Sequence, residues 1–283
     1  MPAFQAHPDS WLLVVALAGG YLYALSAWGP RHAPGGRPAS RSQRWCFLGG
    51  VAVMWVGADW PIHTLAEDYL YSAHMVQHLL FQLVAAPLLI LGTPGWLARK
   101  LLSPGSVLAV WRIITRPLGA LLIVSSWTAL MHVPWVVNNA ATNAGFHFAL
   151  HVLLVIFSVI MWWPVLSPLQ EAPHASYPVR MVYLFGHSII PTVPASFLTY
   201  SQSPLYEVYE QAPRLAAGLD PLTDQQVAGL IMKIPGGLLL WAVIAVLWFR
   251  WQAEEEAGAA DMLYWRDLEG ALGEQAVPPT DRT

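Results

Sequence analysis

Two pairs of histidines have the spacing of a metal-binding site. His74 and His78 occur in the stretch SAHMVQHLL, and His147 and His151 occur in GFHFALH. Residues at positions i and i+4 lie on the same face of an α-helix, with Cβ atoms about 5–6 Å apart. Each pair can therefore present two imidazoles to one ion. Neutral imidazole is a common ligand of copper, zinc and iron.

The segments that carry these histidines are strongly hydrophobic. The chain has 283 residues, of which 56% are hydrophobic and 11% charged, and its mean hydropathy is +0.46. This composition excludes an ordinary soluble domain and is typical of a polytopic membrane protein. The net charge of −3 gives no indication of a nucleic-acid partner, and the single cysteine excludes an intrachain disulfide.

Seven stretches are long and apolar enough to cross a bilayer, for which about 20 such residues are needed. We therefore predict an all-α, seven-helix transmembrane bundle within residues 1–250 and a tail at 251–283. The last residues of the tail, VPPTDRT, are predicted to be disordered. The predicted spans are 11–28, 45–58, 72–93, 115–133, 145–166, 178–200 and 227–249.

The distribution of positive charge predicts how the bundle is oriented. Lys and Arg concentrate in the first and third loops, at the end of the fifth loop and in the tail, whereas the second and fourth loops contain none. Because cytoplasmic loops are enriched in Lys and Arg, the N-terminus is predicted to lie outside and the C-terminus in the cytoplasm. The long sixth loop is predicted to cap the outer side, with solvated carboxylates at Glu207, Glu210, Asp220 and Asp224.

In this orientation, histidines gather in the outer part of the bundle. Ionisable side chains are costly within a membrane and usually face the bundle interior or a wet cavity. A site shared by both pairs and His132 is therefore favoured over separate structural histidines. His63 and its neighbour Asp59 are weaker candidates, because an interfacial hydrogen bond explains them equally well. The outer histidines are His63, His74, His78, His132, His147 and His151.

Met75 is also a weaker candidate ligand. It follows His74 directly, and a thioether ligand would favour Cu(I). Methionine more often fills a core, however, and adjacent residues point about 100° apart on an ideal helix.

Other functions are weighed against a metal site. A b-type haem protein would place histidines on facing helices at two depths, whereas these pairs lie at one depth and within single helices. In a scaffold protein without metal, the histidines would only stabilise the fold. The chain lacks a phosphate-binding glycine loop, an HExxH motif and a nucleophile elbow, so it is not expected to be an enzyme. Low polarity on the inner side disfavours a channel.

The combination of motifs resembles the CtaG family of cytochrome c oxidase assembly factors. The likeness includes SAHMVQHLL, AAPLLILGTP, ALMHVPWVV, SPLYEVYE and DPLTDQQVAGLIMKIPGG, and it covers roughly residues 55–250. The resemblance implies a multi-pass protein of the bacterial plasma membrane that helps to build haem–copper oxidases. It implies oxidase subunits and an extracytoplasmic copper donor as partners. It also implies copper, expected as Cu(I), as the metal carried by His74, His78, His132, His147 and His151.

One position departs from the family pattern. Family members often carry an acidic residue immediately before the second histidine of the fifth span, and this chain has Leu150 there. Such an acid could orient a histidine or balance the charge of a metal. The chain would then need a substitute, for which Asp59 and Asp68 are the candidates.

Overall fold

The computed structural model describes residues 4–215 and 219–275, and within these ranges the chain is helical without a strand. This confirms the predicted all-α class. The helices are α1 (Pro8–Tyr23), α2 (Gly29–His32), α3 (Arg41–Ala58), α4 (Ile62–Asp68), α5 (Tyr71–Leu79), α6 (Ala86–Gly92), α7 (Gly95–Leu101), α8 (Gly105–Ile114), α9 (Pro117–Met131), α10 (Pro134–Thr142), α11 (Ala144–Leu166), α12 (Tyr177–Ile189), α13 (Thr192–Tyr200), α14 (Glu207–Gln211) and α15 (Pro221–Gln275). Two π-helices, η1 (Ala24–Trp28) and η3 (Leu80–Ala85), and one 3₁₀ turn, η2 (Pro34–Gly36), complete them.

The described helices support a membrane protein with five to seven spans. Five continuous helical segments are long and apolar enough to cross a bilayer: Pro8–His32, Tyr71–Gly92, Ala144–Leu166, Tyr177–Tyr200 and Pro221–Gly258. The count rises to seven if each of two bent pairs is one span. These pairs are α3 with α4, bent by 44°, and α8 with α9, bent by 80°. Every predicted span overlaps one of these segments.

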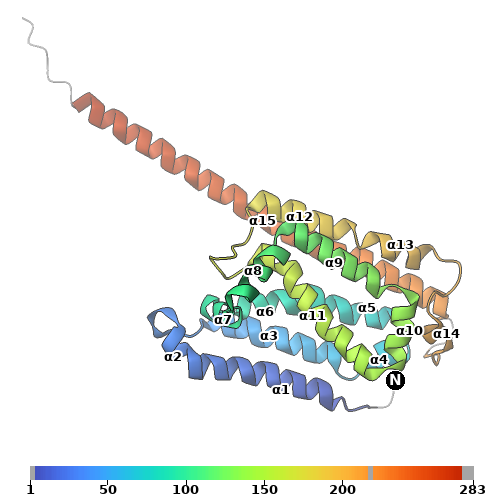
Figure 1. The fold of residues 1–283 in the computed structure, drawn as a ribbon. Helices are drawn as coiled ribbons and strands as arrows, with labels where there is room; N and C mark the ends of the chain where they lie inside the picture. The colour runs from blue at the N-terminus through green and yellow to red at the C-terminus, as the bar shows by residue number, and fades with distance from the viewer. Residues whose placement is uncertain (1–3, 216–218, 276–283) are drawn as a thin grey trace, which may run out of the picture.

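The short elements collect at the two ends of the bundle (Figure 1). The start of α1 lies at one end with α4, α10 and α14, whereas α2, α7 and α8 lie at the other end. The helices α7 and α8 carry Arg99, Lys100 and Arg112. These basic residues therefore lie opposite α4, α10 and α14, as the predicted orientation requires.

The last helix continues through the predicted start of the tail at residue 251. It comprises 55 residues, which corresponds to about 80 Å at 1.5 Å per residue. Figure 1 shows that α15 runs through the bundle from the α14 end and then extends beyond it. The tail thus begins as an extension of the last span, and VPPTDRT lies outside the described residues.

The helix formed by α5, η3 and α6 packs in the middle of the bundle. The carbonyl of Gln82, within η3, accepts a hydrogen bond from Trp162 Nε1 of α11 at 2.8 Å. Leu83, Ile160 and Trp162 belong to the main hydrophobic core. This contact fixes α5 and α11, the two helices that carry the histidine pairs, against each other.

The start of α11 is set by Asn143. Its side-chain oxygen accepts a hydrogen bond from the backbone N–H of Phe146 at 2.9 Å. Asparagine is among the preferred residues at this capping position. The cap places His147 in the first turn of α11 and His151 one turn further along.

Candidate functional site

The structure brings the two histidine pairs together where α5 and α11 face each other. The ring centroids are 4.1 Å apart for His74 and His78, and 4.4 Å apart for His147 and His151. Between the helices, the ring of His78 lies 5.4 Å from that of His151, and the ring of His74 lies 6.0 Å from that of His147. We call these four residues the histidine group.

The histidine group lines a cavity of about 30 Å³. This volume exceeds the roughly 10–15 Å³ that one water molecule needs. Within the described residues, Nδ1 of His74, Nε2 of His147 and Nε2 of His151 are buried without a hydrogen-bond partner. Buried polar atoms are normally paired. Unpaired nitrogens around a small cavity therefore fit a site that takes an ion or a polar ligand.

The histidine group does not have the geometry of a site in which three or more side chains bind one metal ion. In the part of the chain that the structure describes, no three His, Cys, Asp or Glu side chains are placed to hold one metal ion. The two rings of each pair are inclined to each other, by 48° for His74 and His78 and by 69° for His147 and His151. An ion with more ligands than one pair supplies would require the imidazoles to rotate.

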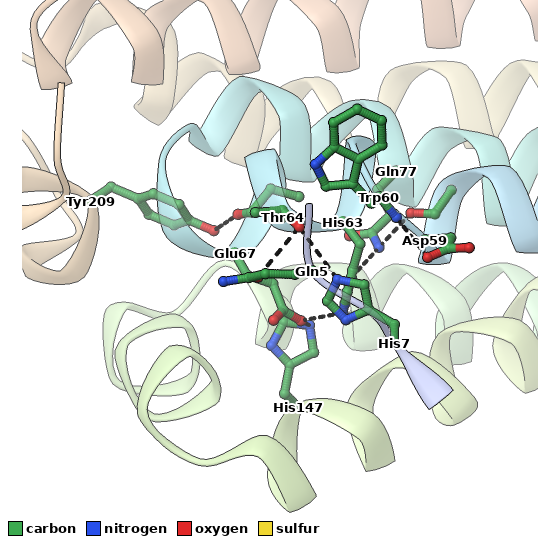
Figure 2. A network of polar contacts seen from close by, with 12 residues as sticks. Gln5, His7, Asp59, Trp60, His63, Thr64, Glu67, Gln77, His147 and Tyr209 are labelled. Atoms are coloured by element: carbon green, nitrogen blue, oxygen red, sulfur yellow. Dashed lines mark hydrogen bonds and ion pairs between the residues drawn. The ribbon is translucent and has the colours of Figure 1, made fainter. Parts of the chain in front are cut away.

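Figure 2 shows a polar network around Glu67, a residue that the sequence reasoning missed. Nε2 of His63 lies 2.9 Å from Oε1 of Glu67, and Nε2 of His147 lies 3.2 Å from the same oxygen. The second contact lacks hydrogen-bond alignment, since Nε2 of His147 has no partner among the described residues. The Glu67 side chain is 31% exposed, whereas both histidines are buried. Glu67 therefore links the histidine group to the surface.

Gln77 fixes which nitrogen of His63 carries the proton. Nε2 of Gln77, which is fully buried, donates to the carbonyl of Gly57 at 2.8 Å and lies 2.9 Å from Nδ1 of His63. Reversing the amide would set its oxygen against the Gly57 carbonyl, so Nδ1 of His63 must be the acceptor. Neutral His63 then has its proton on Nε2 and donates it to Glu67. This bond holds the carboxylate beside His147.

One acidic side chain, that of Glu67, lies at the same cavity as Leu150. Both residues line the cavity of the histidine group, whereas Asp59 and Asp68 do not. The Asp59 carboxylate accepts hydrogen bonds from the indole N–H groups of two tryptophans, at 2.8 and 2.9 Å. Glu67 is therefore better placed than either aspartate to balance charge at the histidines.

His132 and Met75 lie beside the cavity and do not line it. Nδ1 of His132 donates to the Thr128 carbonyl at 2.7 Å, and its Nε2 is buried without a partner within the described structure. Met75 packs in an aromatic cluster that includes Tyr71 and Tyr206. His132 therefore offers a free nitrogen next to the group, whereas Met75 serves the core.

The start of α5 is capped by Asp224 of α15. The Asp224 carboxylate accepts hydrogen bonds from the backbone N–H of Tyr71 at 2.7 Å, from that of Ser72 at 3.3 Å, and from the Ser72 hydroxyl. The expectation that the carboxylates of the sixth loop are solvated is wrong for Asp224, which is 3% exposed. An acidic group suits a helix N-terminus, where N–H groups lack partners. This cap sets the position of His74 in the first turn.

Replacing Asp224 with alanine is expected to destabilise the protein by about 2 kcal/mol, because charged N-terminal caps contribute on that scale. Thermal unfolding of the purified protein would show a lower midpoint. Glu207→Ala, which removes an exposed carboxylate of α14, is the matched control and should leave the midpoint nearly unchanged. Equal midpoints for the two variants would contradict the capping role.

The segment that precedes α15 covers the histidine-bearing end through tyrosines. The hydroxyl of Tyr209 donates to the Ala66 carbonyl at 2.9 Å, and that of Tyr206 donates to the His132 carbonyl at 3.1 Å. Both tyrosines are buried, and Tyr209 also lines the cavity of the histidine group. The predicted cap therefore exists in the structure, and its contacts come from the motif SPLYEVYE.

Two larger cavities adjoin Glu67. One has a volume of about 610 Å³ and is lined by polar residues that include Asp68, Asn138 and Glu207. The other, of about 540 Å³, lies beside α1, α4 and α11 and is bordered by His63, His147 and His151. Glu67 lines both of them as well as the cavity of the histidine group, so its side chain borders all three cavities.

Comparison with protein families finds a match over most of the chain. The family model described as cytochrome c oxidase caa3 assembly factor (Caa3_CtaG) matches residues 19–254. No curated protein and no solved structure matches. The matched region contains the histidine group, Glu67 and Asp224.

Proposed function

Because the chain belongs to the cytochrome c oxidase caa3 assembly factor family, we propose that it binds copper and delivers it to a haem–copper cytochrome c oxidase. The histidine group is the proposed binding site, and Cu(I) is the proposed cargo. The family is named for assembly and not for a reaction, which fits a protein that hands over an ion.

One observation carries the proposal: four imidazoles from two helices surround one small cavity, and three of their buried nitrogens have no partner in the described structure. Imidazole is a suitable copper ligand. Burying charge within a membrane is costly, so a monovalent ion is favoured over a divalent one. Glu67 beside His147 would offset that single positive charge.

The geometry also suits an ion that must be released. The described side chains include no ready set of three ligands, and tight polydentate binding would oppose delivery. The rings of His78 and His151 are 5.4 Å apart. A short rotation of either ring would let an ion move from one pair to the other.

We place the protein in the bacterial plasma membrane, with the histidine-bearing end outside. The apolar helices support a membrane location, and the basic residues of α7 and α8 at the opposite end favour this orientation. The partners would be oxidase subunits and an extracytoplasmic copper donor. The acidic cavity that Glu67, Asp68 and Glu207 line would receive the donated ion.

A b-type haem protein is the alternative function. The cavity within the histidine group, at about 30 Å³, is far too small for a porphyrin. The neighbouring cavity of about 540 Å³ borders His147 and His151, so haem needs a direct test. Haem bound there would give a Soret band that a copper protein lacks.

In cells that make a caa3-type oxidase, His147→Ala/His151→Ala is expected to yield oxidase that contains haem but little copper. Oxidase activity should fall at least about tenfold, as for other losses at metal sites. His32→Ala is the matched control, because His32 is exposed on α2 at the opposite end. Normal oxidase copper in cells with normal amounts of the double variant would contradict the proposal and favour a metal-free scaffold.

A further inference from the structure

A separate cavity lies about one helical turn beyond the histidine group, toward the middle of the bundle. Its volume is about 50 Å³. Gln82, which follows His78 by one turn, lines it, and so does Thr128, whose carbonyl accepts the hydrogen bond from His132. No member of the histidine group lines this cavity, so it is a separate site.

Irregular stretches of three helices surround this cavity. The π-helix η3 contributes Gln82, the break between α12 and α13 contributes Pro191, and α15 contributes Gly236, next to Pro235. A Cβ atom at Gly236 would lie 3.4 Å from the Leu79 side chain, an ordinary van der Waals distance, so α15 packs directly beside α5 here. Irregular backbone within a membrane is tolerated where it lines a cavity, and π-helical turns are frequent at functional sites.

The cavity gathers neutral ligands that prefer soft metal ions. His187 is 3% exposed, and its Nε2 is buried without a hydrogen-bond partner among the described residues. Met161, which is 2% exposed, and Met232 line the same cavity. The Met161 sulfur accepts a hydrogen bond from Nε2 of Gln82 at 3.4 Å, which an ion bound to this sulfur would replace. Thioether and imidazole ligands together favour Cu(I).

Charge also favours a monovalent ion here. None of the described carboxylates lines the cavity, so an ion would enter with its full charge among neutral ligands. Charge within the membrane is costly, and Cu(I) brings less of it than any divalent metal ion. A cavity of about 50 Å³ accommodates a single ion without displacement of the backbone.

We propose that this cavity is a second, deeper Cu(I) site, with His187, Met161 and Met232 as its ligands. The histidine group then offers nitrogen ligands near the end of the bundle, and the deeper site adds sulfur ligands. Movement of Cu(I) between them exchanges ligands and changes no oxidation state. Binding at the deeper site does not depend on the proposed role of the histidine group.

The test is anaerobic Cu(I) titration of the purified full chain, with X-ray absorption at the copper edge. Wild-type protein should bind a second ion in addition to that of the histidine group and show copper–sulfur scattering. His187→Gln and Met161→Leu/Met232→Leu should each lose one ion per chain and the sulfur signal. Met181→Leu is the matched control and should keep both, because Met181 packs against the main core and lines neither cavity.

Two outcomes would overturn the deeper site. One is saturated wild-type protein with nitrogen and oxygen scattering only, as expected if the cavity holds water. The other is an unchanged copper stoichiometry and an unchanged sulfur signal in Met161→Leu/Met232→Leu.

A different variant, His74→Ala/His78→Ala, tests the outer site separately. If this variant keeps only a sulfur-bound ion, both sites stand. If it binds copper as the wild type does while His187→Gln loses the sulfur signal, only the deeper site stands.

Discussion

Replacing His74 and His78 together with alanine is expected to lower the affinity for Cu(I) at the histidine group by more than about 100-fold, since changes in groups that merely support a metal site already cost 10–100-fold. The two imidazoles form one face of the cavity, with ring centroids 4.1 Å apart. Without them, only the pair on α11 remains. His147 and His151 both belong to α11, so no imidazole would bind the ion on the side that faces α5.

Competition with a chromogenic Cu(I) chelator measures this loss. The experiment is made in the His187→Gln background, so that the deeper cavity does not contribute. His32→Ala in the same background is the control, because its imidazole is exposed at the other end of the bundle. Superimposable titration curves for the double histidine variant and the control would show that the pair on α5 binds no copper.

Glu67→Gln is expected to weaken Cu(I) binding at the histidine group by about 10–100-fold, the range seen when a residue behind a metal ligand is lost. The substitution removes the negative charge 3.2 Å from His147 and keeps nearly the same volume. The amide oxygen of glutamine can still accept the hydrogen bond from Nε2 of His63, so the substitution tests the charge. The same chelator competition measures the change.

A second substitution tests whether the charge is what matters. Leu150 lines the same cavity as Glu67, so Leu150→Glu in the Glu67→Gln protein should restore most of the affinity. Leu150→Gln in that background is the matched control and should restore none. If Leu150→Gln rescues as well as Leu150→Glu, the effect of Glu67 is not electrostatic.

Local spacing predicted much of the fold and part of the candidate site. The i,i+4 pattern of His74 with His78 and of His147 with His151 is a property of single helices. Hydropathy predicted seven spans, and each overlaps one of the five to seven candidate spans of the structure. His63 and Glu67 have the same i,i+4 spacing in α4. This spacing predicts that the two side chains lie on one helix face. Glu67 therefore could have been found from the sequence.

Other site residues depend on contacts between distant segments. Asp224 caps α5 across 153 positions of sequence, and its own neighbourhood in the chain resembles a solvated loop. Tyr209 reaches the Ala66 carbonyl across 143 positions. Such features follow from how the helices meet, which hydropathy and periodicity do not specify.

The central claim is that the histidine group holds Cu(I) through nitrogen ligands. The most direct test is copper-edge X-ray absorption, with metal analysis and a visible spectrum, on purified full-length His187→Gln protein loaded with Cu(I). We predict one copper per chain, a first shell of nitrogen scatterers and no Soret band. Protein without copper, or protein with a Soret band and haem iron in place of copper, would contradict the claim.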